Sequence, residues 1–254
     1  MNKLLTVGAM VAGAIGIAAA LVMGGDRMGL MHTGSTSAQT VNVGLPWEIA
    51  EQPGGAARLW GAQGLVLSAQ AEHASTLADV QRLWPIETQV AIVAAPGEEG
   101  ALEAFVDPAQ LGFVAGKLVA ATRLDAGTLK AMRERAIKVE FMDSTTRRYT
   151  LAPADLAVAL RTPVSGISLI PQAQLDADTV LQRFGAPAQR IQRGEGDASV
   201  EHLLYPSKGL DVVVSAKGKE LLQYVAPAQF ERLSQPLQAA SSTSAASAAA
   251  SPAH

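Results

Sequence analysis

The sequence predicts an α+β fold in which short helices pack on small antiparallel meander sheets. Three observations support this class: Thr and Asp capping residues precede several short amphipathic segments, short apolar runs alternate with these segments, and turns containing Gly join consecutive runs. Of the 254 residues, 48 % are hydrophobic but only 4 % are aromatic, which predicts a core of small and branched aliphatic side chains. Without its two atypical ends, the chain suits one domain or two small fused units.

The first half carries clear start and stop signals. Thr76 and Asp79 have capping-box spacing at the start of a helix expected over Thr76–Trp84, Pro85 ends it, and Trp84 is expected in the core. Strands are expected at 88–95, 101–106 and 114–122. Asp125 then caps a helix expected over 126–136, followed by strands at 138–142 and 148–151.

In the second half, Pro153 opens a helix expected to reach Leu160, and a strand follows at 167–170. Asp176 caps a further helix through Phe184, and Gly185 suits its end because glycine adopts positive φ at little cost. A meander of strands is expected at 199–205, 210–215 and 220–225, the last two joined by the hairpin turn Ala216-Lys217-Gly218.

The two halves echo each other, which suggests two repeated helix-plus-three-strand units. Val80-Gln81-Arg82-Leu83-Trp84 resembles Leu181-Gln182-Arg183-Phe184, and each segment precedes a meander. Proline also recurs where a strand is expected to give way to a helical turn, at Pro108, Pro153 and Pro227. The repeated halves would be 62–124 and 164–233; a chance echo is the alternative.

The segment Asp176–Val225 resembles the SmpA/OmlA family of outer-membrane assembly lipoproteins. The shared pattern is a short helix ending in Phe184-Gly185-Ala186-Pro187, a strand with Tyr205, and two strands joined at Lys217-Gly218. The resemblance implies a helical layer on a small antiparallel sheet, an arrangement also seen in β-lactamase-inhibitor-like domains. The whole chain resembles uncharacterised single-anchor envelope proteins of proteobacteria. The family's lipidated cysteine is absent, so the resemblance implies neither a lipid anchor nor partner-binding residues.

The N-terminal segment predicts the location of the domain. An apolar run from Leu4 to Met23 matches the thickness of a bilayer, so residues 1–25 are expected to form a transmembrane anchor; a cleaved signal peptide is the alternative. Residues 26–45 are expected to form a flexible linker, 46–233 the domain, and 234–254 a disordered Ser/Ala tail. Lys3 favours a cytoplasmic N-terminus, so the protein is predicted to lie in the bacterial inner membrane with a periplasmic domain.

The predicted anchor carries a ladder of small residues. Gly8, Ala12, Gly16 and Ala20 recur every four residues on one helix face, where small side chains let two helix backbones approach closely. A homodimer formed through this face is one hypothesis. The alternative is that a segment rich in Gly and Ala produces such a ladder by chance.

Composition and spacing argue against several kinds of site. A net charge of −3 disfavours a nucleic-acid partner, and the absence of cysteine excludes disulfides and thiolate sites. His32, His73, His202 and His254 share no metal-ligand spacing, so neither a metal nor a cofactor is expected. We expect His202 to be an exposed or half-buried strand histidine; a general base is the alternative reading.

The densest basic stretch includes Arg133, Arg135, Arg147 and Arg148, which mark a candidate interaction surface for an acidic partner or for lipid headgroups. A solvated helix face and turn is the alternative. The sequence as a whole predicts a non-catalytic interaction module of the cell envelope that docks on another envelope protein. A domain that binds a small molecule or lipid is the second hypothesis, and a hydrolase with a dispersed active site is the third.

Overall fold

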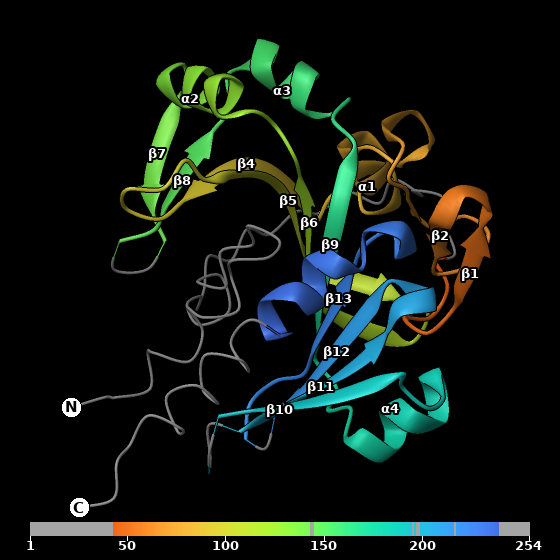
Figure 1. The fold of residues 1–254 in the computed structure, drawn as a ribbon. Helices are drawn as coiled ribbons and strands as arrows, with labels where there is room; N and C mark the ends of the chain where they lie inside the picture. The colour runs from red at the N-terminus through yellow and green to blue at the C-terminus, as the bar shows by residue number, and fades with distance from the viewer. Residues whose placement is uncertain (1–42, 143–144, 195, 197–198, 216, 239–254) are drawn as a thin grey trace, which may run out of the picture.

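A ten-stranded antiparallel sheet organises the chain in a computed structural model that describes residues 43–142, 145–194, 196, 199–215 and 217–238 (Figure 1). Its strands, in chain order, are β4 (Thr88–Ala94), β5 (Ala101–Leu111), β6 (Val114–Thr122), β7 (Lys138–Phe141), β8 (Arg147–Thr150), β9 (Val164–Pro171), β10 (Gln189–Arg193), β11 (Val200–Tyr205), β12 (Leu210–Ser215) and β13 (Leu221–Tyr224). Side by side they follow the order β10-β11-β12-β13-β9-β6-β5-β4-β8-β7. Strands β7 and β10 are therefore the two edges.

Short helices and a smaller sheet complete the fold. The small antiparallel sheet consists of β1 (Ile49–Gln52), β2 (Ala56–Leu59) and β3 (Val66–Leu67). The α-helices are α1 (Leu77–Leu83), α2 (Ala126–Glu134), α3 (Pro153–Ala159) and α4 (Ala177–Phe184). Single 3-10 turns lie at η2 (Pro53–Gly55), η3 (Ala71–His73), η5 (Pro206–Lys208) and η6 (Pro227–Gln229).

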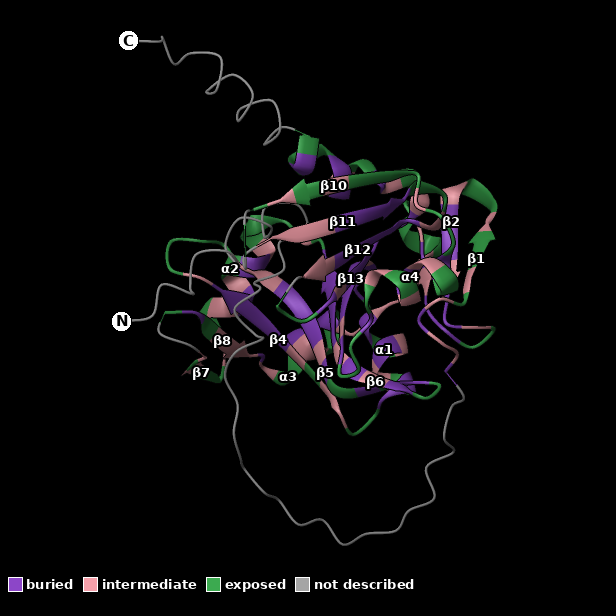
Figure 2. Ribbon diagram, turned by 90° about the horizontal axis from the view of Figure 1, so that it is seen from below, coloured by how far each residue is buried: buried purple, intermediate pink, exposed green. Residues whose placement is uncertain are grey.

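The strand register places alternate side chains of the large sheet on two faces. The front face is defined by buried aliphatic residues that continue from strand to strand: Ile92, Leu102, Leu118, Leu169, Leu222, Val212 and Leu203. These residues form one core with the apolar sides of α1–α4 and with Leu59 and Leu67 of the small sheet. The central strands are accordingly buried along much of their length (Figure 2).

The opposite, back face packs against the C-terminal end of the described chain. Residues 231–238 are helical. Leu233 and Leu237 of this segment form a second buried cluster with Ala121, Leu204 and Val225 on the back face. The helix is tied to β9 by Arg232, whose Nη1 donates a hydrogen bond to the carbonyl of Ser165 at 2.8 Å.

Aromatic side chains join the small sheet to the large one. Trp60 packs edge-on against Trp84 and Tyr224, with ring centroids 6.0 and 5.8 Å apart. Trp84 is buried, as predicted. Trp47 packs edge-on against Phe184 of α4 at 6.4 Å. The entry of the chain into the domain is thereby fixed against the front-face core.

The predicted α+β class with short helices and antiparallel sheets is confirmed. The capping signals are also confirmed: Thr76 and Asp79 form a capping box at α1, Asp125 and Asp176 cap α2 and α4, and Gly185 ends α4 with φ 84°. The prediction for Pro108 is wrong, because β5 continues through it to Leu111 with a register shift between Val106 and Ala109.

The extent of the domain differs from the expected 46–233. Val43 is already buried, and the amide of Gly44 donates to the carbonyl of Trp60 at 2.7 Å. At the other end the helix reaches residue 238. The predicted anchor 1–25, most of the predicted linker and residues 239–254 lie outside the described residues. Among the described residues, no helix is long and apolar enough to cross a membrane.

Candidate functional site

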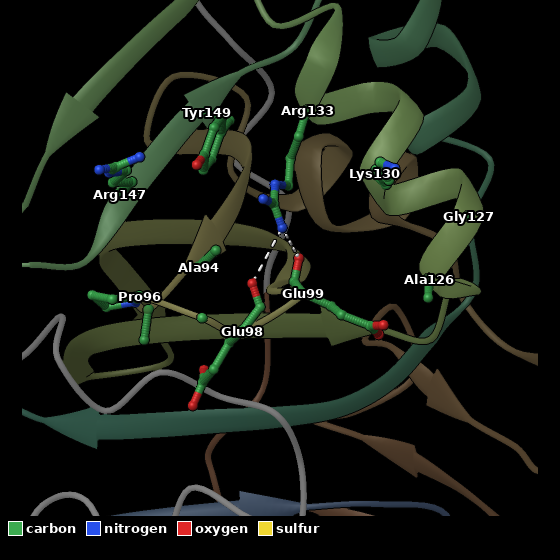
Figure 3. A pocket seen from close by; sticks show the side chains of 12 residues that line it. Ala94, Pro96, Glu98, Glu99, Ala126, Gly127, Lys130, Arg133, Arg147 and Tyr149 are labelled. Atoms are coloured by element: carbon green, nitrogen blue, oxygen red, sulfur yellow. Dashed lines mark hydrogen bonds between the residues drawn. The ribbon is translucent and has the colours of Figure 1, made fainter.

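The candidate site is a cleft of about 590 Å3 between α2, β8 and the turn that links β4 to β5 (Figure 3). Its walls bring together parts of the chain that are distant in sequence. Residues 94–99 form one side, Ala126, Gly127, Lys130 and Arg133 of α2 form another, and Arg147 and Tyr149 of β8 complete it. Helix α2 is fixed here because Asp125 accepts hydrogen bonds from the amide and hydroxyl of Thr128, at 2.8 and 2.6 Å, which also lower the pKa of Asp125.

Arg133 lies at the centre of the cleft and holds the turn in place. Its Nη1 donates to the carbonyl oxygens of Glu98 and Glu99, at 3.2 and 2.7 Å. Its guanidinium carbon lies 5.2 Å from the centroid of the Tyr149 ring, within the range of a cation–π contact. The buried Nε has no hydrogen-bond partner. Arg133 therefore supplies positive charge and also determines the shape of the cleft.

Two further cations line the same cleft. Arg147 stacks over Phe141 at 5.2 Å and forms no ion pair with a carboxylate in the described parts of the chain. Lys130 lies 4.0 Å from Glu134 in an exposed pair, which contributes little at the surface. The carboxyl groups of Glu98 and Glu99 point away from the Arg133 guanidinium (Figure 3). The cleft therefore presents an excess of positive charge.

The other two predicted arginines lie elsewhere. Arg135 makes two hydrogen bonds to Asp155, at 3.1 and 2.7 Å, and so ties the end of α2 to α3. The hydrogen bond from Arg135 lowers the pKa of Asp155. Arg148 follows Arg147 in β8 but lies on the back face, where it contacts Glu140 at 3.0 Å. The structure thus brings Arg133 and Arg147 together and separates Arg135 and Arg148 from them.

Lys130 and Tyr149 are two lining residues that the sequence analysis did not single out and that could contact an anion. Lys130 precedes Arg133 by three residues, which places both on one side of α2. Tyr149 is two residues from Arg147 and therefore on the same face of β8. Helical periodicity starting from Arg133 points to Lys130, and strand alternation starting from Arg147 points to Tyr149.

The prediction for His202 is wrong, because its side chain is fully buried rather than exposed or half-buried. His202 lies on the back face of β11, and its Nδ1 is 2.8 Å from a carboxyl oxygen of Asp211, which is 1 % exposed. Burial raises the pKa of Asp211, against the opposing hydrogen bond from His202. The free Nε2 of His202 is also buried and unpartnered. A general base must reach the proton that it removes, and this enclosed pair lacks that access.

The back face carries further buried polar groups, of which Glu103 and Ser168 lack hydrogen-bond partners. Both carboxyl oxygens of Glu103 lack hydrogen-bond partners, and burial raises the pKa of Glu103 to about 8. Ser168 is 4 % exposed, and its hydroxyl also lacks a partner. Glu103 pairs with Ala121, and Ser168 pairs with Val119, so both side chains lie on the same face as His202. Burying polar groups without hydrogen-bond partners lowers the stability of the fold.

Across the described residues, no three His, Cys, Asp or Glu side chains form a group that could hold a metal ion. Comparisons of the chain with protein-family models, curated proteins and solved structures give no match. The resemblance to the SmpA/OmlA family therefore stays a prediction. The chemistry that the cleft itself offers is anion binding by guanidinium, ammonium and phenol donors.

Proposed function

We propose that this protein is a non-catalytic interaction module of the cell envelope that binds an acidic segment of another envelope protein in the cleft between α2 and β8. One observation supports this function most directly: Lys130, Arg133 and Arg147 border the same cleft, while the neighbouring carboxyl groups of Glu98 and Glu99 point away from Arg133 (Figure 3). Arginine suits carboxylate recognition because its planar donors match the two oxygens.

The three cations would act differently on an acidic segment. Arg133 is already engaged with two carbonyl oxygens, so it supplies a fixed positive field. Arg147 has no carboxylate partner among the described residues and is the group best able to pair directly with a carboxylate. Complementary charge of this kind contributes specificity and association rate, and it makes binding sensitive to salt.

The proposed location rests on the sequence. The apolar segment within residues 1–25 would anchor the chain in the inner membrane, leaving the domain in the periplasm. A phosphatase reporter that is active only outside the cytoplasm, fused after His254, should be active in intact cells. Activity of a cytoplasmic reporter at the same site would contradict this topology.

Binding can be tested on the full chain in detergent with a fluorescent peptide rich in Asp and Glu. Arg147→Gln should weaken binding about tenfold, which corresponds to about 1.4 kcal/mol, because it removes the unpaired cation. Arg148→Gln is the matched control: the neighbouring arginine of the same strand lies on the other face and should leave affinity nearly unchanged. Equal losses in both variants, or equal binding of the Asn/Gln version of the peptide, would contradict specific docking in the cleft.

A small anionic molecule is the alternative ligand. The cleft volume of about 590 Å3 falls in the range of pockets that hold small molecules. Inorganic phosphate at millimolar concentration should displace the peptide if both use Arg147. Tight binding of small anions together with undetectable peptide binding would favour this alternative over a protein partner.

We also propose that the two halves of the domain are repeated units of the kind the SmpA/OmlA resemblance suggests. In support, α1 precedes the β4–β5–β6 meander, α4 precedes the β10–β13 meander, and both helices pack in the front-face core. In an experimental structure, α1–β6 should superpose on α4 and its meander. Unrelated crossing angles of the two helices on their strands would contradict duplication.

A further inference from the structure

The two edges of the large sheet differ in how they are protected. Edge strand β10 has the sequence Gln-Arg-Ile-Gln-Arg, and charged or amide side chains of this kind discourage pairing with another chain. Edge strand β7 has the sequence Lys-Val-Glu-Phe and carries apolar side chains that are exposed to solvent. No described strand lies beyond β7, which forms the margin of the molecule next to α2 (Figure 1).

The exposed apolar residues of this edge lie on one face. Val139 is 49 % exposed and Phe141 is 68 % exposed, and both lie on the front face because Val139 pairs with Tyr149 and Phe141 pairs with Arg147. Ile137, which is 66 % exposed, precedes β7 by one residue, and its amide donates to the carbonyl of Thr150 at 3.0 Å. Lys138 and Glu140 lie on the back face and form an ion pair of 2.7 Å. The edge thus has an apolar side and a charged side.

We propose that β7 pairs antiparallel with β7 of a second copy of this chain, around a two-fold axis at Val139. In an antiparallel pair, residues directly opposite each other lie on the same face. With Val139 opposite its own copy, Ile137 lies opposite Phe141 of the second copy, so the exposed apolar residues meet one another. The same register places Lys138 opposite Glu140 of the second copy.

This match depends on register. Moving the axis by one residue to Glu140 would place two Glu140 carboxylates opposite each other, and like charges directly opposed are destabilising. The register at Val139 instead gives two apolar Ile–Phe pairs, one Val–Val pair and two Lys–Glu pairs. A two-fold contact requires self-complementarity of this kind. The charged residues and the apolar residues of β7 therefore both favour a second copy of this chain as the partner of this edge.

The proposed contact borders the basic cleft at Arg147 but is formed by other residues. Arg147 stacks over Phe141 and keeps its guanidinium beside the edge, but no residue of the turn 95–99 takes part. A pairing of about five residues per chain is a small interface and forms weak complexes in free solution. Attachment of two copies to one membrane would raise their effective concentration.

A disulfide test suits this chain because it has no cysteine. Full-length Val139→Cys in membranes, treated with a mild oxidant, should give a dimer that a reductant reverses, since directly opposed Cα atoms lie about 4.5–5.5 Å apart, within disulfide range. Phe141→Cys alone should not crosslink, because its copy is offset by four residues, or about 13 Å. Mixed with chains carrying Ile137→Cys, which should also fail alone, it should form a heterodimer.

Val139→Lys should weaken dimerisation of the full chain at least tenfold in sedimentation, since it places two ammonium groups at the axis. Val158→Lys is the matched control, because Val158 is 43 % exposed and lies on α3 rather than on β7. Similar crosslinking at 137, 139 and 141 would indicate random collision and overturn the proposal. So would a dimer that survives Val139→Lys and is lost with Gly16→Ile, because it would form through the anchor.

Acidic-peptide binding should remain in monomeric Val139→Lys, so the two proposals can fail separately.

Discussion

At the scale of single residues, helix caps depend on contacts within one segment, whereas the buried polar groups of the large sheet depend on contacts between strands. Thr76, Asp125 and Asp176 were recognisable because a cap is a local contact within four residues. The His202–Asp211 pair joins two strands across the sheet, and nothing in the sequence around His202 shows that its face is covered. Glu103 likewise lies in an apolar strand where its pKa depends on burial alone.

The buried Glu103 is expected to make the stability of the protein depend on pH. Its folded-state pKa of about 8 lies above the ordinary carboxyl value of 4.5, so the folded state binds more protons between these pH values. Stability should therefore fall as pH rises through this window, by up to about 1.4 kcal/mol per pH unit. Glu103→Gln removes the ionisation. Urea unfolding should show a smaller loss of stability between pH 5 and pH 8 in this variant, and at pH 8 the variant should be more stable than the wild type by at least about 1 kcal/mol.

Asp211 is a second buried carboxyl group that should contribute to the same pH dependence. Burial also raises the pKa of Asp211, so part of the pH dependence should remain in Glu103→Gln and should become smaller still when Asp211→Asn is added to it. If Glu103→Gln followed the wild-type pH curve without change, the Glu103 carboxyl would have to be ionised in the folded protein.

At the scale of elements, helices α1–α4 and most strands of the large sheet could be predicted, including the edge strand β7, but the polar edge strand β10, the short strands β1–β3 and the helix 231–238 could not. Strand β6 was placed at its observed bounds because Val114–Thr122 is apolar and bounded by turns. Strand β10 has the polar sequence of an exposed edge and was missed, as were β1–β3, which have only two to four residues each. Such strands exist because neighbouring strands pair with them, and that information is not local.

The cleft, too, could be predicted only as far as it depends on local sequence. Helix α2 and strand β8 were predicted from their own residues, so their arginines could be identified. Which arginine faces the cleft depends on the strand register and on the position of α3, because Asp155 of α3 binds Arg135. Local sequence therefore predicted that this region is basic, but it did not predict which two of the four arginines line the cleft.

The helical segment 231–238 is expected to stabilise the large sheet. Leu233 and Leu237 are buried against the back face, and burying a leucine contributes about 1.5–3 kcal/mol. A chain ending at Phe230 should therefore lose about 3 kcal/mol or more of unfolding free energy, measured with urea. A chain ending at Gln238 removes only residues beyond the described helix and should keep its stability. Equal stability of both truncations would show that the helix does not support the sheet.

At the scale of the whole molecule, the ten strands belong to one sheet even though the sequence suggests two units. Strand β9 pairs with β13 on one side and with β6 on the other, so it joins the two meanders through continuous hydrogen bonding. The front-face core also runs without a break from Ile92 to Leu203. A shared sheet and a shared core favour cooperative unfolding of both halves.

Leu222 tests this continuity because it lies in β13, while Trp47, Trp60 and Trp84 all lie in the first half of the chain. Leu222 is fully buried, so Leu222→Ala should cost about 2–5 kcal/mol. If the sheet unfolds as one unit, tryptophan fluorescence and far-UV circular dichroism should shift together to lower urea concentration. Val158→Ala, at an exposed site on α3, should move neither signal by much. Two separated transitions, with the tryptophan signal unchanged by Leu222→Ala, would mean that the halves unfold independently despite the shared strand β9.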